Sequence, residues 1–243
     1  MELLVFGHAG ERVLVFPTRQ GRFYDYENWR QVEAVRDFIE AGTIQLFCVD
    51  SIDSESLYCW HRSPRERIIR HGQYEAYILQ EVAPFTASKN GVRELVAHGC
   101  SIGAYHAVNI ALRHPQVFSK VVAFSGRYDL TRPAGIFPDL FCGYYDQDIY
   151  FHTPSHFLPG LNDDSILAHL RRLDITITVG EYDPFRESSS ELSRILTGKG
   201  ISHQLFVWDG EAHKARCWRH MAWLYLGNRS LGWNRTTTVV DNT

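Results

Sequence analysis

Short apolar segments alternate with amphipathic segments along most of the chain, and this alternation predicts the secondary structure. Two apolar segments near the N-terminus, 3–6 and 12–16, are separated by Gly7 and Gly10 and are typical of a β-hairpin. Further strands are predicted at 43–49, 92–97, 120–124, 175–179 and 204–208. Helices are predicted at 27–40, 63–82, 104–114, 165–172, 188–198 and 215–225. Such alternation indicates the α/β class: a mainly parallel central sheet with an antiparallel N-terminal hairpin and helices on both faces.

One long stretch, residues 125–159, breaks the alternation. It is rich in Phe, Tyr, Pro and Asp and shows no clear period. An irregular stretch of this length in a compact domain is usually functional, so we expect a lid or pocket wall, with a well-packed surface insertion as the alternative. We treat residues 1–231 as one domain and 232–243 as a polar, loose C-terminal tail.

The composition narrows the classes of function. With 243 residues, 44% hydrophobic and 22% charged, the sequence suits a single globular domain with a sizeable core. The net charge of −3, without a basic block, argues against nucleic acid and anionic membranes as partners. No apolar run approaches the roughly 18 residues that span a membrane, and the first residues do not read as a signal peptide. Five cysteines without a C-x-x-C pair favour reduced thiols and therefore the cytoplasm.

The most informative motif is Gly99-Cys100-Ser101-Ile102-Gly103, which reads G-x-S-x-G between a predicted strand and a predicted helix. This context is that of a nucleophile elbow, a turn so tight that larger side chains in place of the two glycines would clash. The serine oxygen would point outward at the end of the strand. The N–H of Ile102 would open the next helix, where it can stabilise a negatively charged oxygen. The alternative is an ordinary turn with a serine at the start of a helix.

A serine nucleophile needs a base, and the base needs an acid that orients it. On this fold the order along the chain is Ser, then Asp or Glu, then His, each at the carboxyl end of a strand. Asp183 follows the predicted strand 175–179, and His213 follows the last one, so Ser101, Asp183 and His213 form the predicted catalytic triad. Glu181 and Asp209 lie in the same two loops and are alternatives for the acid.

A second oxyanion donor is expected from the loop after strand 12–16. Pro17 has no N–H, and within the loop 17–22 we select the backbone of Gln20 or Arg19 as the donor, with Gln20 slightly favoured. Gly21 would allow the backbone to approach a substrate. A simple surface turn is the alternative for this loop.

Several of these segments resemble the putative esterase family of α/β-hydrolases. They are residues 13–18, the elbow with residues 105–109, and residues 124–130, 150–151, 158–163 and 180–183. The family includes bacterial carboxylesterases and relatives of esterase D, S-formylglutathione hydrolase and the mycolyltransferases. The resemblance covers about residues 1–226 and implies an α/β-hydrolase fold, the triad of Ser101, Asp183 and His213, and an oxyanion hole made by Ile102 and the loop after Phe16. The sequence shows no cluster of metal-ligating residues, and the predicted chemistry needs neither a metal ion nor a cofactor.

Three positions depart from the family pattern. Ala104 stands where relatives often have a second glycine, and Arg19 stands where they often have a small residue. Lys214 follows His213 where an aspartate and a tryptophan are usual. The residue types of the triad are kept, so the departures bear on pocket shape and substrate choice.

The sequence therefore predicts a serine hydrolase that cleaves carboxylic esters of a small molecule through an acyl-serine intermediate. An acyltransferase or thioesterase would use the same three residues. A non-catalytic binding protein on a hydrolase scaffold is a third hypothesis, motivated by the altered surroundings of His213. No oligomeric state is predicted.

Overall fold

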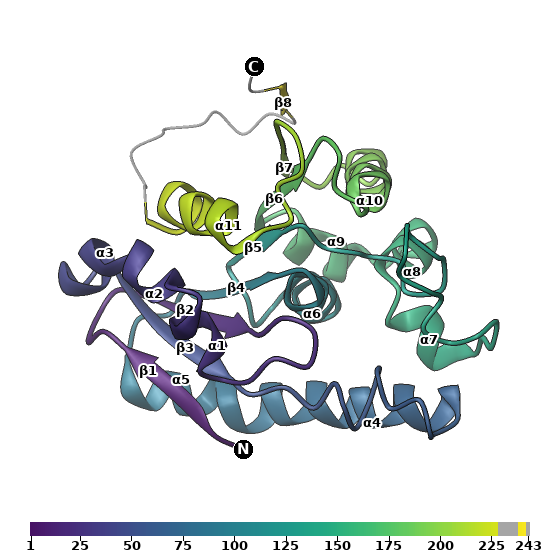
Figure 1. Ribbon diagram of the computed structural model, residues 1–243, viewed down its shortest axis with the longest axis horizontal. Coiled ribbons are helices and arrows are strands. Elements are labelled where there is room, and N and C mark those ends of the chain that lie inside the picture. Colours follow the sequence, from purple (N-terminus) through teal and green to yellow (C-terminus); the bar gives the residue numbers. More distant parts are fainter. Residues whose placement is uncertain (228–237, 242–243) are drawn as a thin grey trace.

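One sheet forms the centre of the molecule in a computed structural model that describes residues 1–227 and 238–241 (Figure 1). Its eight described strands lie in the order β1-β3-β2-β4-β5-β6-β7-β8, and every pair except β1–β3 is parallel. The strands are β1 (Leu3–Phe6), β2 (Glu11–Phe16), β3 (Ile44–Val49), β4 (Leu95–Cys100), β5 (Lys120–Phe124), β6 (Asp174–Gly180), β7 (Gln204–Trp208) and β8 (Thr238–Asp241).

Helices cover both faces of the sheet (Figure 1). They are α1 (Asp25–Asn28), α2 (Gln31–Ala34), α3 (Arg36–Glu40), α4 (Pro64–Tyr77), α5 (Ala83–Lys89), α6 (Ile102–Arg113), α7 (Gln147–Phe151), α8 (Pro154–Gly160), α9 (Asp164–Leu170), α10 (Arg186–Gly198) and α11 (Ala215–Ala222). Two π-helical turns, η1 (Ile78–Val82) and η2 (Trp223–Gly227), extend α4 and α11. The predicted α/β class and α/β-hydrolase architecture are confirmed.

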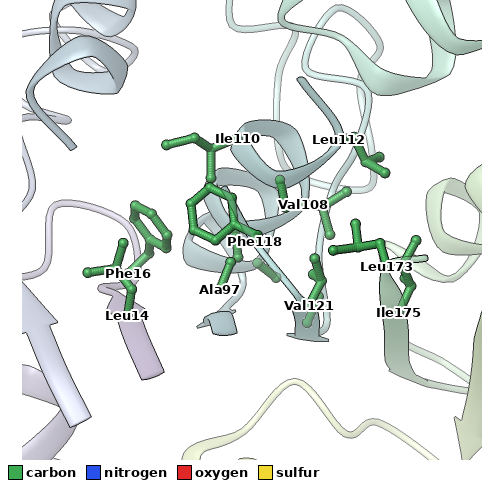
Figure 2. Close-up of a cluster of buried hydrophobic side chains, with 14 of the residues drawn as sticks. Leu14, Phe16, Ala97, Val108, Ile110, Leu112, Phe118, Val121, Leu173 and Ile175 are labelled. Atoms are coloured by element: carbon green, nitrogen blue, oxygen red, sulfur yellow. The ribbon is translucent and has the colours of Figure 1, made fainter. Parts of the chain in front are cut away.

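Alternating side chains of the central strands pack into two hydrophobic clusters, one on each face of the sheet, because neighbouring residues of a strand point to opposite faces. Leu14 and Phe16 of β2 pack in a cluster with α4, α6 and α10, whereas Val13 and Val15 pack in a cluster with α1–α3 and α11. Figure 2 shows Val108 of α6 among side chains of the first cluster. Every residue of α6 from Ile102 to Leu112 is buried, so this helix is packed on all sides and holds the turn before it rigidly.

The N-terminal strand is antiparallel as predicted, but its partner differs from the expectation. β3 lies between β1 and β2, so the first two strands flank β3 instead of pairing with each other. The conformation of Gly10, with φ 90°, allows the loop before β2 to pass close to β3. A Cβ atom on Gly10 would lie 2.1 Å from the carbonyl carbon of Thr43, so only glycine lets the 7–10 loop pass against the start of β3.

Two predicted helices have different extents in the structure. The segment 27–40 forms three short helices, interrupted where Arg30 adopts a left-handed conformation at φ 59°. The helix predicted at 63–82 begins with a capping box of Ser63 and Glu66 and continues through η1 into α5. Pro84 lacks an N–H, and the helix widens into the π turn just before it.

The irregular segment 125–159 contains two short helices, α7 and α8, that the sequence pattern did not indicate. The expected loose tail lies mostly outside the described residues, and within it Thr238–Asp241 form β8 parallel to β7. A single domain over residues 1–231 stays a prediction. No described helix is long and apolar enough to cross a membrane.

Candidate active site

Ser101 occupies a strained turn between β4 and α6. Its backbone has φ 58° and ψ −122°, a conformation that residues with a side chain rarely adopt. Gly99 and Gly103 make the turn possible, because a Cβ on Gly99 would lie 2.3 Å from Gly103 and a Cβ on Gly103 would lie 2.4 Å from the carbonyl oxygen of Phe16. The Ser101 N–H donates to the carbonyl of Phe124 on β5 at 2.8 Å, which fixes the serine at the edge of the sheet.

The structure brings Ser101, Asp183 and His213 together. His213 Nε2 lies 3.2 Å from Ser101 Oγ. On the other side of the ring, His213 Nδ1 lies 3.2 Å from Asp183 Oδ2 and 3.3 Å from Oδ1. The two alternative acids, Glu181 and Asp209, are exposed, and neither bonds to His213 within the described part of the chain.

The loops after β6 and β7 hold the acid and the histidine in this register. β6 ends at Gly180, which packs against the loop after β7. A Cβ atom on Gly180 would lie 2.5 Å from the Ala212 nitrogen. The N–H of Tyr182 donates to the carbonyl of Gly210 at 3.0 Å, so the loops are hydrogen-bonded to each other. Asp183 and His213 therefore come from two loops that are packed and hydrogen-bonded against each other.

Asp183 is buried, with 4% of its surface exposed. Burial raises the pKa of its carboxyl group, but the hydrogen bond and charge of His213 and the N–H of Phe185 lower it by more, so the net pKa lies below the ordinary value. The Phe185 N–H donates to Oδ1 at 2.9 Å. Asp183 is consequently an ionised acceptor at neutral pH and selects the histidine tautomer that carries its proton on Nδ1.

Aromatic side chains fix the plane of the His213 ring. The rings of Phe185 and Trp218 meet it edge to face, with centroids at 5.3 Å and 5.1 Å. Trp218 is itself anchored, since its Nε1 donates to Ser125 Oγ at 3.2 Å and its ring stacks on Trp29 at 5.9 Å. This packing leaves His213 Nε2 facing the serine.

The backbone groups expected to form the oxyanion hole differ in whether their N–H is already hydrogen-bonded. Ile102 is the first residue of α6, and its N–H makes no hydrogen bond with the described residues. Gln20, the favoured second donor, has its N–H bound to Asp53 Oδ2 at 3.3 Å. Arg19 lines the same cleft as Ser101 and Ile102, whereas Gln20 lines a neighbouring pocket. Because the Gln20 N–H is bound while that of Arg19 makes no hydrogen bond with the described residues, Arg19 is the better candidate for the second donor.

Asp53, which the motif analysis did not single out, lies behind the loop after β2. It is buried, and its second oxygen, Oδ1, lies 3.1 Å from His106 Nε2 on α6. Through Gln20, which is held at φ 54°, it ties the loop after β2 to the helix that begins at the elbow. Its place after β3, at the same edge of the sheet as the triad, is the signal that could have revealed it.

A cleft of about 300 Å³ opens in front of Ser101. Its lining residues are Thr18, Arg19, Trp29, Tyr58, Ser101, Ile102, Arg127, Phe137, Phe185, His213 and Trp218. From the segment 125–159, Arg127 and Phe137 reach the cleft, while Phe141 is buried in a core cluster with Tyr105. An apolar wall with few polar groups is typical of small-molecule sites.

Within the described ranges, no three His, Cys, Asp or Glu side chains gather as metal ligands would.

Residues 24–220 match the profile of the family described as Putative esterase. The chain belongs to this family. It is an esterase with the α/β-hydrolase fold, as the resemblance implied. A comparison with curated protein sequences gives no match.

Solved structures share the fold at low sequence identity. A ferulic acid esterase superposes with a TM-score of 0.68 at 15% identity, over 90% of this chain and 84% of that one. Fluorophosphonate-binding serine hydrolase F of Staphylococcus aureus gives 0.63 at 13% identity, over 90% and 84%. An S-formylglutathione hydrolase from Agrobacterium tumefaciens gives 0.61 at 13% identity, over 90% and 83%. At these identities the likeness establishes the fold, and the choice of substrate rests on the site itself.

Proposed function

We propose that this esterase hydrolyses carboxylic esters through an acyl intermediate on Ser101, with His213 as the base and Asp183 as the acid that orients it. One observation carries the proposal: a single histidine ring bridges the serine oxygen at 3.2 Å and a buried carboxylate at 3.2 Å. The serine oxygen faces a cleft large enough for a small ester. This is the arrangement that an activated serine needs.

The first half of the reaction forms the acyl-enzyme. His213 Nε2 takes the proton of Ser101 as the serine oxygen attacks the ester carbonyl, and the imidazolium that forms is stabilised by Asp183. The tetrahedral oxyanion is stabilised by the N–H of Ile102 and by a backbone N–H of the loop after β2, for which we propose Arg19. His213 then returns the proton to the departing alcohol, and the C–O bond of the ester breaks.

The second half releases the acid. His213 takes a proton from water, the resulting hydroxide attacks the acyl carbon, and Ser101 leaves with the proton that His213 returns. An acyltransferase or a thioesterase would differ only in the acceptor or in the leaving group. We propose water as the acceptor because the family is one of esterases.

The cytoplasm is our proposal for the site of action. All five cysteines are free, and three of them, Cys48, Cys59 and Cys100, are buried in the reduced form. Free thiols are typical of a reducing compartment.

The function is tested with p-nitrophenyl esters of increasing acyl length and with matched thioesters, with and without an added alcohol. Hydrolysis of one or more oxygen esters by the wild type, and its loss in Ser101→Ala, is the expected result. Ser88→Ala is the matched control, because Ser88 is exposed on α5, outside the cleft. Faster turnover of thioesters, or preferential transfer to the alcohol, would replace hydrolysis of oxygen esters as the function. Equal rates for Ser101→Ala and the wild type would remove the serine from the reaction.

A further inference from the structure

Two arginines line the cleft in front of Ser101, and none of its lining residues is an aspartate or a glutamate. Arg19 and Arg127, with Tyr58 and Phe137, also line a side pocket of about 120 Å³ that adjoins the cleft. The protein as a whole carries a net charge of −3. A locally positive cleft in a net negative molecule therefore needs an explanation.

Arg127 is a buried cation, with 4% of its surface exposed. Its Nε donates to the carbonyl of Asp129 at 3.1 Å. Its Nη2 donates to the carbonyls of Leu130, Arg132 and Pro138. In the part of the chain that the structure describes, Nη1 donates no hydrogen bond and no carboxylate lies within 4.0 Å of the guanidinium. The pKa of Arg127 is lowered because burial desolvates the cation and no carboxylate is in contact with it.

The acids nearest to Arg127 are occupied by other groups. Asp129 Oδ2 lies 3.2 Å from His156 Nε2 and 3.3 Å from Arg132 Nε. Asp139 accepts the backbone N–H groups of Phe141 and Gly143 at 2.7 Å and 2.6 Å. These carboxylates raise the pKa of Arg127 only at a distance. Within the described residues its Nη1 therefore has no partner and can donate to a ligand.

Arg19 approaches the same space from the other wall. Its guanidinium carbon lies 6.0 Å from the ring centroids of both Tyr58 and Phe137. Its side chain is exposed, and among residues 1–227 and 238–241 it forms no ion pair. Aromatic faces hold a guanidinium in place without neutralising it, so its hydrogen-bond donors stay free for a ligand.

We propose that the preferred substrates are esters that also carry a carboxylate, which binds between Arg19 and Arg127 while the ester carbonyl lies at Ser101. This inference rests on the proposed function and adds the substrate class. A guanidinium matches the two oxygens of a carboxylate, and the charge-assisted bonds are stronger than neutral ones. A positive cleft also raises the local concentration of an anionic substrate.

The test compares anionic and neutral esters of matched shape in two pairs. In the first pair the carboxylate lies on the acyl side: p-nitrophenyl hemiadipate against p-nitrophenyl hexanoate. In the second pair it lies on the alcohol side: 4-acetoxybenzoate against its methyl ester. The readout is the ratio of kcat/KM, anionic over neutral, for the wild type, Arg19→Gln and Arg127→Lys. Arg194→Gln, which removes the same charge from exposed α10 outside the cleft, is the matched control.

We expect Arg19→Gln to lower the ratio about tenfold or more in one pair, as befits a hydrogen bond to a charged group. The pair that responds tells on which side of the ester the carboxylate lies. Arg194→Gln should leave both ratios at the wild-type value. Arg127→Lys should lower the same ratio as Arg19→Gln, with thermal melting recorded because Arg127 also holds the loop that ends at Pro138. Ratios for Arg19→Gln within twofold of the wild type in both pairs would overturn the inference and leave the esterase function intact.

A binding measurement separates this inference from the reaction. Calorimetry on Ser101→Ala requires no turnover and uses one pair for each side of the ester: monomethyl adipate against methyl hexanoate, and 4-acetoxybenzoate against its methyl ester. Tighter binding of the anionic ester, lost in the double variant Ser101→Ala with Arg19→Gln, would support the carboxylate site even if hydrolysis were never observed. Equal binding of the anionic and the neutral ester in both pairs would contradict it.

Discussion

The two sides of the active site are built differently. On the base side, the loops after β6 and β7 carry Asp183 and His213, and each functional group bonds directly to the next. On the oxyanion side, the proposed donors are backbone N–H groups, and the loop proposed to carry one of them is bonded through Gln20 to a buried carboxylate, Asp53, from the loop after β3. The base side would act through the side chains themselves. The oxyanion side would act through backbone N–H groups whose positions are set by other residues.

This difference predicts how each side responds to mutation. In the proposed mechanism, removing a triad side chain removes a group that takes part in the reaction, whereas the backbone donors cannot be removed by changing their own side chains. The oxyanion side is disturbed only through residues such as Asp53 that hold the loop. We therefore expect large losses from changes on the base side and intermediate losses from changes behind the oxyanion loop.

The largest effects should come from the base side. His213→Ala should reduce kcat by a factor on the order of 10⁶, and Asp183→Asn by about 10⁴, because the latter keeps the shape but favours the wrong histidine tautomer. Steady-state kinetics with a p-nitrophenyl ester measure both. Glu181→Gln and Asp209→Asn are the matched controls and should stay near the wild type. A severe loss in either control together with a mild one in Asp183→Asn would move the acid to that residue.

The oxyanion side should show an intermediate effect. Asp53→Asn weakens the bond to the Gln20 N–H and the contact with His106, so the loop that carries Arg19 should lose its fixed position. Loss of one whole oxyanion donor costs about 10²–10³ in kcat, and we expect Asp53→Asn to cost about tenfold or more, mainly in kcat and not in KM. Asp163→Asn, at the exposed N-cap of α9, is the control for a changed acid. An unchanged kcat in Asp53→Asn would show that the loop keeps its shape without the carboxylate.

The elements around these two sides could largely be predicted from the sequence. The strand-turn-helix pattern at Ser101 and the loop positions of Asp183 and His213 follow from local periodicity and from the order along the chain. The position of Asp53 after β3 follows the same order along the chain, but its bonds to Gln20 and His106 are long-range contacts that the order does not predict. Arg127 could not be found in that way, because it acts through bonds to backbone carbonyls. The insertion of β3 between the first two strands is likewise a long-range pairing that local turn signals do not encode.

The segment 125–159 should contribute selectivity more than rate. Phe137 lines the cleft and packs against Phe185 at a centroid distance of 4.9 Å. Phe137→Ala should change the preference among acyl chain lengths by a few-fold, while Phe151→Ala, exposed on α7 outside the cleft, should not. The p-nitrophenyl ester series measures both variants. If Phe137→Ala only lowers the melting temperature and keeps the parent's preference, this residue is packing and not pocket wall.

The smallest effect is on the pH dependence of stability. The pKa of Asp183 is lowered in the folded state, so its contribution to stability is present above the unfolded pKa of roughly 3.9 and is lost as the pH falls below that value. Melting temperatures of the wild type and of Asp183→Asn between pH 3 and pH 7 should converge at the acid end. A constant difference between the two across this range would mean that Asp183 is not stabilised as a carboxylate.

The most direct test of the central claim is covalent labelling with a fluorophosphonate, followed by mass spectrometry of the intact protein and of its peptides. If Ser101 is activated by His213, we expect one adduct per chain, on Ser101, because only an activated serine attacks the phosphorus atom. We also expect no adduct in Ser101→Ala and a much slower reaction in His213→Ala. A wild-type protein that stays unlabelled, or that carries the adduct on another residue, would contradict the proposal that Ser101 and His213 form a working nucleophile and base.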